Sequence, residues 1–163
     1  MPREANKLRI GVAGLGGGAR QMISAMLNLP NIEIAAAADQ DPSVLQKFST
    51  EFGKPVYRDV ATMCADRNLD AIYVATPNRF HVEHATMAME LGKHVLLEKP
   101  MATKIEETDQ IIDLSERRGL SLAVSAPHSV EPHIKAVTRF VEQETYGKLW
   151  AIQTFHFGDW LYR

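Results

Sequence analysis

Residues Leu8–Ala19 read LRIGVAGLGGGA, and this stretch decides the fold class of the 163-residue chain. The first six of these residues are mostly apolar and predict a strand. Apolar residues then recur at three- and four-residue steps from Ala19 to Leu27, which predicts a helix. Gly14, Gly16 and Ala19 form the pattern Gly-x-Gly-x-x-Ala between the two elements. A strand, a glycine turn and a helix in this order are the typical start of a parallel α/β sheet.

The glycine turn suits a bound pyrophosphate. Gly14 can take a turn that a side chain would obstruct, Gly16 lets a phosphate approach the backbone, and small Ala19 lets the helix pack closely on the strand. The first amides of the helix, from Gly17 onward, are available to phosphate oxygens. The alternative is a glycine-rich turn with no ligand, because Gly11, Gly17 and Gly18 crowd the same stretch.

An acidic residue at the end of the second expected strand favours a dinucleotide. Asp39 lies 25 positions after Gly14, close to the about 20 at which an acidic residue binds the adenosine ribose. Capping a helix before Pro42 is the alternative role, although Asp41 could fill it equally well. A carboxylate at Asp39 would repel a 2′-phosphate and Gln40 adds no positive charge, so we expect NAD as the cofactor in preference to NADP.

The remaining sequence continues the alternation of strands and helices, which predicts a Rossmann doubly wound parallel sheet of the α/β class. A Thr103-x-x-Glu106 capping box should start the helix that Gly119 ends. Phe80, His84, Met87 and Leu91 share one face of an earlier helix. We expect further strands at 34–38, 55–57, 71–75, 94–97 and 120–126, and further helices at 42–52, 60–65, 80–91 and 103–118.

The elements after the sixth expected strand no longer fit the alternation of strands and helices that forms the six-stranded sheet. We place a domain boundary there, with an NAD(P)-binding domain at 1–126. Residues 127–163 should begin a second α/β domain with a helix at 134–141 and an aromatic strand at 149–157. That second domain would be truncated in this chain.

Composition excludes several classes of protein. Hydrophobic residues make up 45% and charged residues 23%, and the net charge of -2 includes no basic block. These values predict a globular protein with a small-molecule partner and without a nucleic-acid or membrane partner. Cys64 is the only cysteine, which excludes an internal disulfide, and no signal region follows Met1. A cytoplasmic location fits both features.

A second group of polar residues follows the fourth expected strand. Ala75, Thr76, Pro77 and Asn78 come at its carboxyl end, where ligands bind in open α/β sheets. A turn and a helix cap would explain proline and asparagine equally well. His81 and His84 lie three positions apart, but further metal ligands are not evident, so we expect no metal site.

Together, several motifs resemble those of the Gfo/Idh/MocA oxidoreductase family over residues 8–157. The motifs are Gly14-Leu15-Gly16, Tyr57-Arg58-Asp59, Ala75-Thr76-Pro77-Asn78 with His81, and Gly92-Lys93-His94-Val95 leading to Glu98-Lys99-Pro100. The resemblance implies an N-terminal Rossmann domain and a C-terminal substrate domain with an open mixed sheet. It also implies hydride transfer between NAD and a hydroxyl-bearing carbon of a sugar or cyclitol.

The resemblance also assigns roles to particular residues. Lys99 would contact the substrate and assist proton movement, as a partly desolvated lysine can. Glu98 and Pro100 would shape the cofactor turn, with Pro100 after a cis peptide bond. Thr76, Pro77, Asn78 and His81 would lie near the nicotinamide. His128 is a candidate pocket residue, and a loop histidine with no role is the alternative.

The end of the chain leaves two functional hypotheses open. Residues 159–163 are similar to a stretch in dihydroxyphthalate dehydrogenase-like members of the family, which adds a cyclic dihydrodiol to the substrate classes. We expect a fragment of a longer dehydrogenase that is a homo-oligomer when whole, with the fragment itself inactive. A dinucleotide-binding sensor without catalysis is the alternative.

Overall fold

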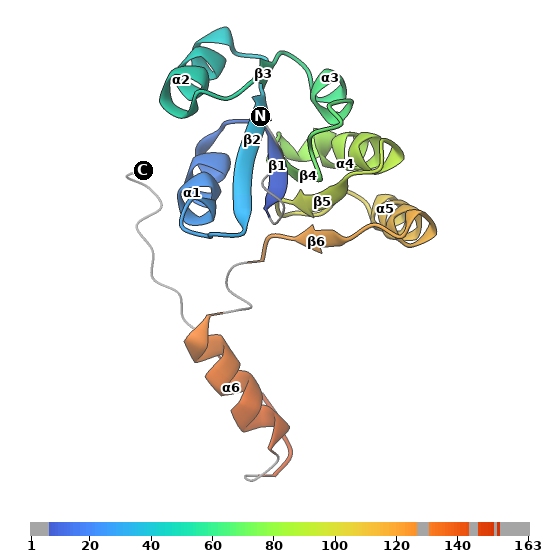
Figure 1. Ribbon diagram of the computed structural model, residues 1–163. Coiled ribbons are helices and arrows are strands. Elements are labelled where there is room, and N and C mark those ends of the chain that lie inside the picture. Colours follow the sequence, from blue (N-terminus) through green and yellow to red (C-terminus); the bar gives the residue numbers. More distant parts are fainter. Residues whose placement is uncertain (1–6, 127–130, 144–146, 152, 154–163) are drawn as a thin grey trace. The chain divides into compact units, whose positions relative to one another are not determined.

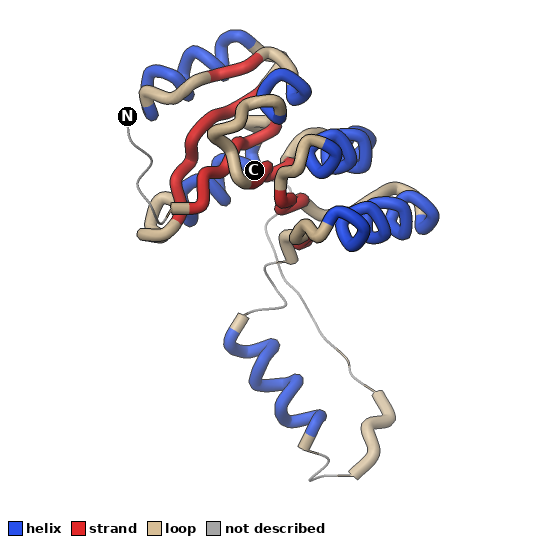
Figure 2. Tube along the Cα trace, turned by 45° about the vertical axis from the view of Figure 1, so that its right-hand side comes forward, coloured by secondary structure: helices blue, strands red, loops and turns tan. Residues whose placement is uncertain are grey.

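The computed structural model describes residues 7–126, 131–143, 147–151 and 153. The chain divides into two compact units, Met1–Ser125 and Ala126–Arg163. In the first unit six parallel strands form one sheet, and Figures 1 and 2 show helices on both of its faces. The α/β class and the doubly wound parallel sheet predicted from the sequence are therefore confirmed.

The strand order places a ligand crevice at one edge of the sheet. The order is β3-β2-β1-β4-β5-β6, so the chain winds outward from β1 in one direction and then from β4 in the other. The crevice at such a reversal, outside the carboxyl ends of the strands, is where open α/β sheets bind ligands. The strands are β1 (Leu8–Ala13), β2 (Ile32–Ala38), β3 (Val56–Tyr57), β4 (Ala71–Val74), β5 (His94–Leu97) and β6 (Leu122–Val124).

Two apolar clusters hold the helices on the sheet. Helices α1 (Gly17–Met26) and α2 (Pro42–Phe52) cover one face, where Ile23 and Phe48 are buried. Helices α3 (Val60–Cys64), α4 (His81–Glu90) and α5 (Ile105–Arg118) cover the other face. The strands between them are apolar on both sides, as a sheet covered by helices requires.

The helix ends follow simple capping rules with one correction. Asp41 and Asp59 cap α2 and α3, and left-handed Gly53 and Gly119 end α2 and α5. The predicted capping box at the start of α5 is wrong in register. The helix begins one residue later than a Thr103 cap requires, so Glu107 instead of Glu106 stands at its third position. Glu107 accepts hydrogen bonds from both the backbone N–H and the hydroxyl of Thr103.

Helix α4 buries a different face from the predicted one. Its buried residues are His81, Ala85, Ala88 and Met89, whereas Leu91 just after the helix is 47% exposed. The small alanines let the helix lie close to the strands, and the larger side chains Phe80, His84 and Met87 of the predicted face are only partly buried. These three residues line the pocket described below.

The second unit contains one described helix, α6 (Pro132–Glu142), close to the predicted span. The predicted strand at 149–157 is wrong for residues 149–151 and 153, which form no regular structure. A strand needs a neighbouring strand for its backbone hydrogen bonds, and the described part of this unit provides none. The other residues of that predicted strand lie outside the described ones.

Among the described residues, none of the helices has the length and apolarity that a membrane crossing requires. The same residues contain no cluster of three or more histidine, cysteine or acidic side chains suited to a metal ion. Cys64 is a free, buried thiol, and burial raises its pKa to about 11.

Acid should destabilise this fold through four carboxylates. Hydrogen bonds from Lys54, Ser43, Thr62 and Asn68 lower the pKa values of Glu33, Asp41, Asp59 and Asp66, respectively. Folded-state values below the ordinary 4.5 for Glu and 3.8 for Asp mean that their stabilisation is complete above those values. It is lost as the pH falls through the folded-state pKa values.

Urea denaturation at about pH 7 and about pH 3 should therefore give a lower midpoint in acid. The variant Asp41→Asn keeps an N-cap that does not titrate, so it should lose less stability between the two pH values. Equal midpoints for the unmodified chain would contradict the role of these carboxylates.

Candidate cofactor site

A pocket of about 620 Å³ opens at the carboxyl edge of the sheet. Its wall is made by the turn after β1, the ends of β2 and β3, the start of α3, the turn after β4 and the first turns of α4. Six of the predicted cofactor residues meet there: Gly14, Gly16, Gly17, Asp39, Thr76 and Pro77. The structure thus brings together residues that are more than 60 positions apart in the chain.

Gly14 makes the tightest turn at the pocket floor. Its φ is +86°, and a Cβ added to it would lie 2.7 Å from the Ala75 carbonyl oxygen. Its N–H donates to the Ala38 carbonyl at 2.8 Å, which holds the turn against β2. A residue with a side chain would therefore be both strained and in collision with backbone.

The next three glycines form an open cradle. A Cβ on Gly16, Gly17 or Gly18 would meet nothing within 4 Å, and no side chain caps the start of α1. Backbone N–H groups at a helix start bind anions well, and a phosphate fits this open space. Ala19 lies in the core at 1% exposure, so it packs the helix on the sheet and does not line the pocket.

Asp39 connects the end of β2 to the glycine turn. Its Oδ2 accepts the Leu15 N–H at 2.8 Å and its Oδ1 accepts the Asp41 N–H at 2.9 Å. Asp41 caps α2 through Ser43, so the alternative role considered for Asp39 belongs to its neighbour. A carboxylate offers about four acceptor positions, which leaves the Asp39 carboxylate able to accept two ribose hydroxyls.

The turn after β4 is held by hydrogen bonds to histidines. The Thr76 hydroxyl lies 3.0 Å from His84 Nδ1, and burial lowers the pKa of His84. Pro77 precedes a short 3-10 helix, η1 (Asn78–Phe80). Thr76 and Pro77 line the pocket, whereas exposed Asn78 does not.

His81 does not have the predicted contact with the pocket. The side chain is 1% exposed and is absent from the pocket wall. Its Nδ1 lies 2.7 Å from the Pro100 carbonyl oxygen and its Nε2 lies 2.8 Å from the Thr76 carbonyl oxygen. Both ring nitrogens are therefore occupied by protein backbone. The histidine of α4 that does line the pocket is His84, one turn further along.

The Glu98-Lys99-Pro100 turn follows β5 at the same edge of the sheet. The Tyr73 hydroxyl donates to Glu98 Oε1 at 2.7 Å and the Lys99 N–H donates to Glu98 Oε2 at 3.1 Å. Burial and the hydrogen bond to Glu98 raise the pKa of Tyr73, which keeps its hydroxyl protonated as a donor. Lys99 is exposed, and the Lys99–Pro100 peptide bond is cis, as predicted. Glu98 and Lys99 lie outside the wall of the pocket.

Sequence reasoning missed several residues of the pocket wall. Arg58, Arg79, Phe80, Glu83 and Met87 all line it, and the Arg79 guanidinium lies 4.5 Å from the centre of the Phe80 ring. The Asp39 N–H donates to the Tyr57 carbonyl, so Arg58 directly follows the residue beside Asp39. A search of the β3 end would have found this cation, because parallel strands end at one edge.

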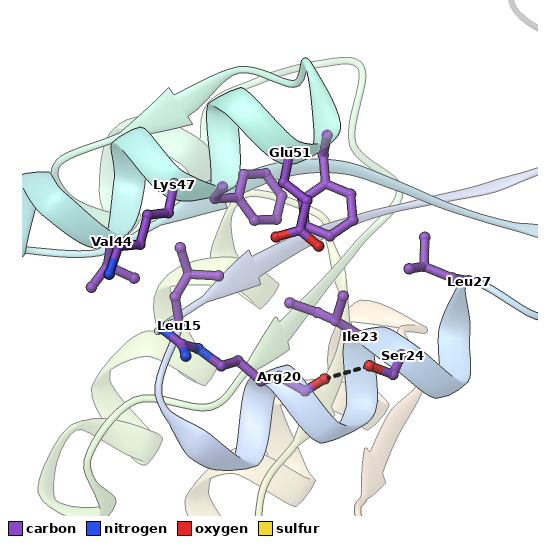
Figure 3. Close-up of a pocket in the computed structure, with 10 residues that line it drawn as sticks. Leu15, Arg20, Ile23, Ser24, Leu27, Val44, Lys47 and Glu51 are labelled. Carbon is purple, nitrogen blue, oxygen red and sulfur yellow. Dashed lines mark hydrogen bonds between the residues drawn. The ribbon is translucent and has the colours of Figure 1, made fainter.

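Another pocket, of about 230 Å³, lies between α1 and α2. Figure 3 shows Ile23 of α1 and Leu27, directly after α1, on one side of it and Glu51 of α2 on the other. No residue that we predicted to bind a cofactor or substrate lines this pocket. His128 and residues 159–163, which also entered the predictions, lie outside the described residues.

The chain is similar to proteins of one family. Residues 8–126 match the model of the Gfo/Idh/MocA oxidoreductase family with an NAD-binding Rossmann fold. The chain is 34% identical over 157 residues to 1-carboxy-3-chloro-3,4-dihydroxycyclohexa-1,5-diene dehydrogenase of Comamonas testosteroni, covering 96% of this chain and 40% of that protein. It is 34% identical over 116 residues to dTDP-3,4-didehydro-2,6-dideoxy-alpha-D-glucose 3-reductase of Saccharopolyspora spinosa, covering 71% and 35%.

The fold is similar to that of a solved enzyme. The crystal structure of scyllo-inositol dehydrogenase from Lactobacillus casei, with bound NAD(H) and scyllo-inositol, matches with a TM-score of 0.81 and 22% identity. The match covers 85% of this chain and 42% of that one. The chain thus spans less than half the length of these relatives.

Proposed function

The chain belongs to the Gfo/Idh/MocA family of oxidoreductases with an NAD-binding Rossmann fold, and from this premise we propose that the pocket at the carboxyl edge binds NAD. The open cradle of Gly16 to Gly18 would receive the pyrophosphate at the start of α1. Asp39 would accept the adenosine ribose hydroxyls. Thr76 and Pro77, across the pocket, would lie toward the nicotinamide. The observation that carries this proposal is the uncapped glycine cradle beside the Asp39 carboxylate.

The whole protein would act as a dehydrogenase or reductase on a ring alcohol. NAD supplies a hydride acceptor when bound, and oxidation of an alcohol also requires its hydroxyl proton to leave. Lys99 is the residue we propose to hold that proton, because its exposed side chain follows β5 beside the β4 turn. Glu98, fixed by Tyr73, would position the backbone that carries Lys99.

The substrate class is proposed from the relatives. The protein from Comamonas testosteroni is a dehydrogenase of a dihydroxylated cyclohexadiene, and that from Saccharopolyspora spinosa reduces a sugar nucleotide. A hydroxyl-bearing ring carbon of a cyclic dihydrodiol, a sugar or a cyclitol is therefore the proposed reaction centre. In that scheme residues 1–126 form the NAD-binding domain and residues 127–163 begin the substrate domain. A homo-oligomer in the cytoplasm is the form we propose for the whole protein.

Calorimetric titration of the chain with NAD and with NADP tests the cofactor proposal. We expect NAD to bind about tenfold more tightly or better, because Asp39 would repel the 2′-phosphate. The variant Asp39→Asn should bring the two affinities closer together, whereas Asp41→Asn, which changes a carboxylate two residues away, should not. Equal affinities in the unmodified chain would contradict the preference for NAD.

A further inference from the structure

One part of the pocket wall takes no part in the contacts proposed for NAD. The glycine cradle would receive the pyrophosphate and Asp39 the adenosine ribose, which leaves the adenine ring that is bonded to this ribose. The same wall also contains Arg58, at the end of β3, and Arg79 and Phe80 of η1. Lys99, proposed to act at the nicotinamide end, lies outside the wall. The pocket therefore has side chains to spare for the adenosine half of the cofactor.

Arg79 and Phe80 form a supported flat surface on this wall. The Arg79 guanidinium lies over the Phe80 ring, 4.5 Å from its centre. The Phe80 ring stacks in turn against the His84 ring, with the centres 5.6 Å apart and an angle of 28° between the planes. The Thr76 hydroxyl lies 3.0 Å from His84 Nδ1. Because the neighbouring side chains hold this stack in place before a ligand arrives, binding to it costs less conformational freedom.

We infer that Arg79 is the adenine-binding residue of the cofactor pocket, with its guanidinium stacked between the Phe80 ring and the adenine ring of NAD. A guanidinium is planar and stacks on aromatic rings and on bases. Among the described residues, none forms a hydrogen bond or an ion pair with the exposed Arg79 side chain. The side of the guanidinium away from Phe80 is thus available to a ligand. The inference rests on the proposed function, because it requires NAD in this pocket.

The charges on the wall favour an uncharged ring over a phosphate as the ligand of Arg79. Asp39, Asp59 and Glu83 line the same pocket as the guanidinium groups of Arg58 and Arg79. Three carboxylates thus accompany two guanidinium groups, and nearby carboxylates oppose the binding of an anion. Adenine carries no charge, and stacking on its face does not require a net positive wall.

Arg58 is the other guanidinium on the wall, and it lacks the support that Arg79 has. Its side chain is exposed, and among the described residues no aromatic ring lies against it. A long, unsupported side chain loses more conformational freedom when a ligand fixes it. The flat contact with adenine is therefore assigned to Arg79 and not to Arg58.

Calorimetric titration of variants with NAD tests the inference. Arg79→Ala removes the planar group and its charge, whereas Arg79→Lys removes the planar group and keeps a positive charge. We expect the dissociation constant for NAD to rise about five- to tenfold in both variants. Arg67→Ala is the matched control, because Arg67 is an exposed arginine outside the wall of the pocket, and it should bind NAD as the unmodified chain does. Full affinity in either Arg79 variant would overturn the inference.

Nuclear Overhauser contacts in the unmodified chain locate the adenine directly. At saturation with NAD, we expect contacts between the H2 or H8 proton of adenine and the side-chain protons of Arg79. Their absence at saturation would overturn the inference even if the variants bind more weakly. If the unmodified chain binds no NAD, the proposed function fails and the inference fails with it. If NAD binds but neither the affinities nor the contacts involve Arg79, only the inference fails.

Discussion

Alanine at position 14 should destabilise the first unit by about 3 kcal/mol or more, or prevent its folding. The residue would have to take a φ of +86° with its Cβ 2.7 Å from the Ala75 oxygen. The backbone has little room to move, because the Ala75 N–H donates to the Ala13 carbonyl at 2.8 Å and the Gly14 N–H to Ala38. Urea denaturation followed by circular dichroism measures the loss.

Variants at two other glycines distinguish the strain of a positive φ from the collision with the Ala75 oxygen. Gly53 also has a positive φ, of +62°, but a Cβ there would meet nothing within 4 Å, so Gly53→Ala should cost only about 1 kcal/mol. Gly16→Ala should keep the stability of the fold and weaken NAD binding, since its methyl group would enter the cradle. If Gly14→Ala lowers the free energy of unfolding by no more than Gly53→Ala does, the close approach of Gly14 to the Ala75 oxygen is not the reason that this position requires glycine.

Turnover should fall by about 10²- to 10⁴-fold when Lys99 is replaced by methionine. This expectation applies to a longer protein that joins the chain to a complete second domain, assayed with NAD and a panel of cyclic diols, sugars and cyclitols. Methionine keeps most of the length of lysine but cannot hold a proton. NAD binding should change little, because Lys99 lies outside the wall of the pocket.

Lys104→Met is the matched control for this experiment. Lys104 is also exposed, five residues along the same segment, and its side chain makes no capping hydrogen bond. Turnover in Lys104→Met should equal that of the unmodified enzyme. Equal turnover in Lys99→Met would remove Lys99 from the proposed mechanism and leave the cofactor site intact.

The parts of this molecule that depend on local sequence could be predicted. Apolar runs indicated the strands, Asp41 and Gly53 bounded α2 where expected, and Gly14 stood where a tight turn after β1 requires glycine. The meeting of Gly14, Asp39 and Thr76 in one pocket followed from a general property of parallel sheets, in which strand ends share an edge. None of these predictions needed a contact between specific distant residues.

The parts that depend on distant partners could not be predicted. Which face of α4 is buried is set by how closely Ala85 and Ala88 allow the helix to approach the sheet, and periodicity alone does not contain that distance. The role of His81 depends on the carbonyl of Pro100, 19 positions away. The hydrogen bond between Tyr73 and Glu98 likewise joins β4 to the turn after β5. Sequence shows that such residues are present but not which atoms they meet.

The turns at the other edge of the sheet offer places to modify the protein. Gly53, Gly92 and Gly119 all have positive φ, and a Cβ added to any of them would meet nothing within 4 Å. They follow α2, α4 and α5, so each precedes a strand and lies away from the carboxyl ends where the pocket opens. Exposed turns of this kind accept insertions and new chain ends. A fluorophore, an affinity tag or a circular permutation placed there would leave cofactor chemistry to the opposite edge.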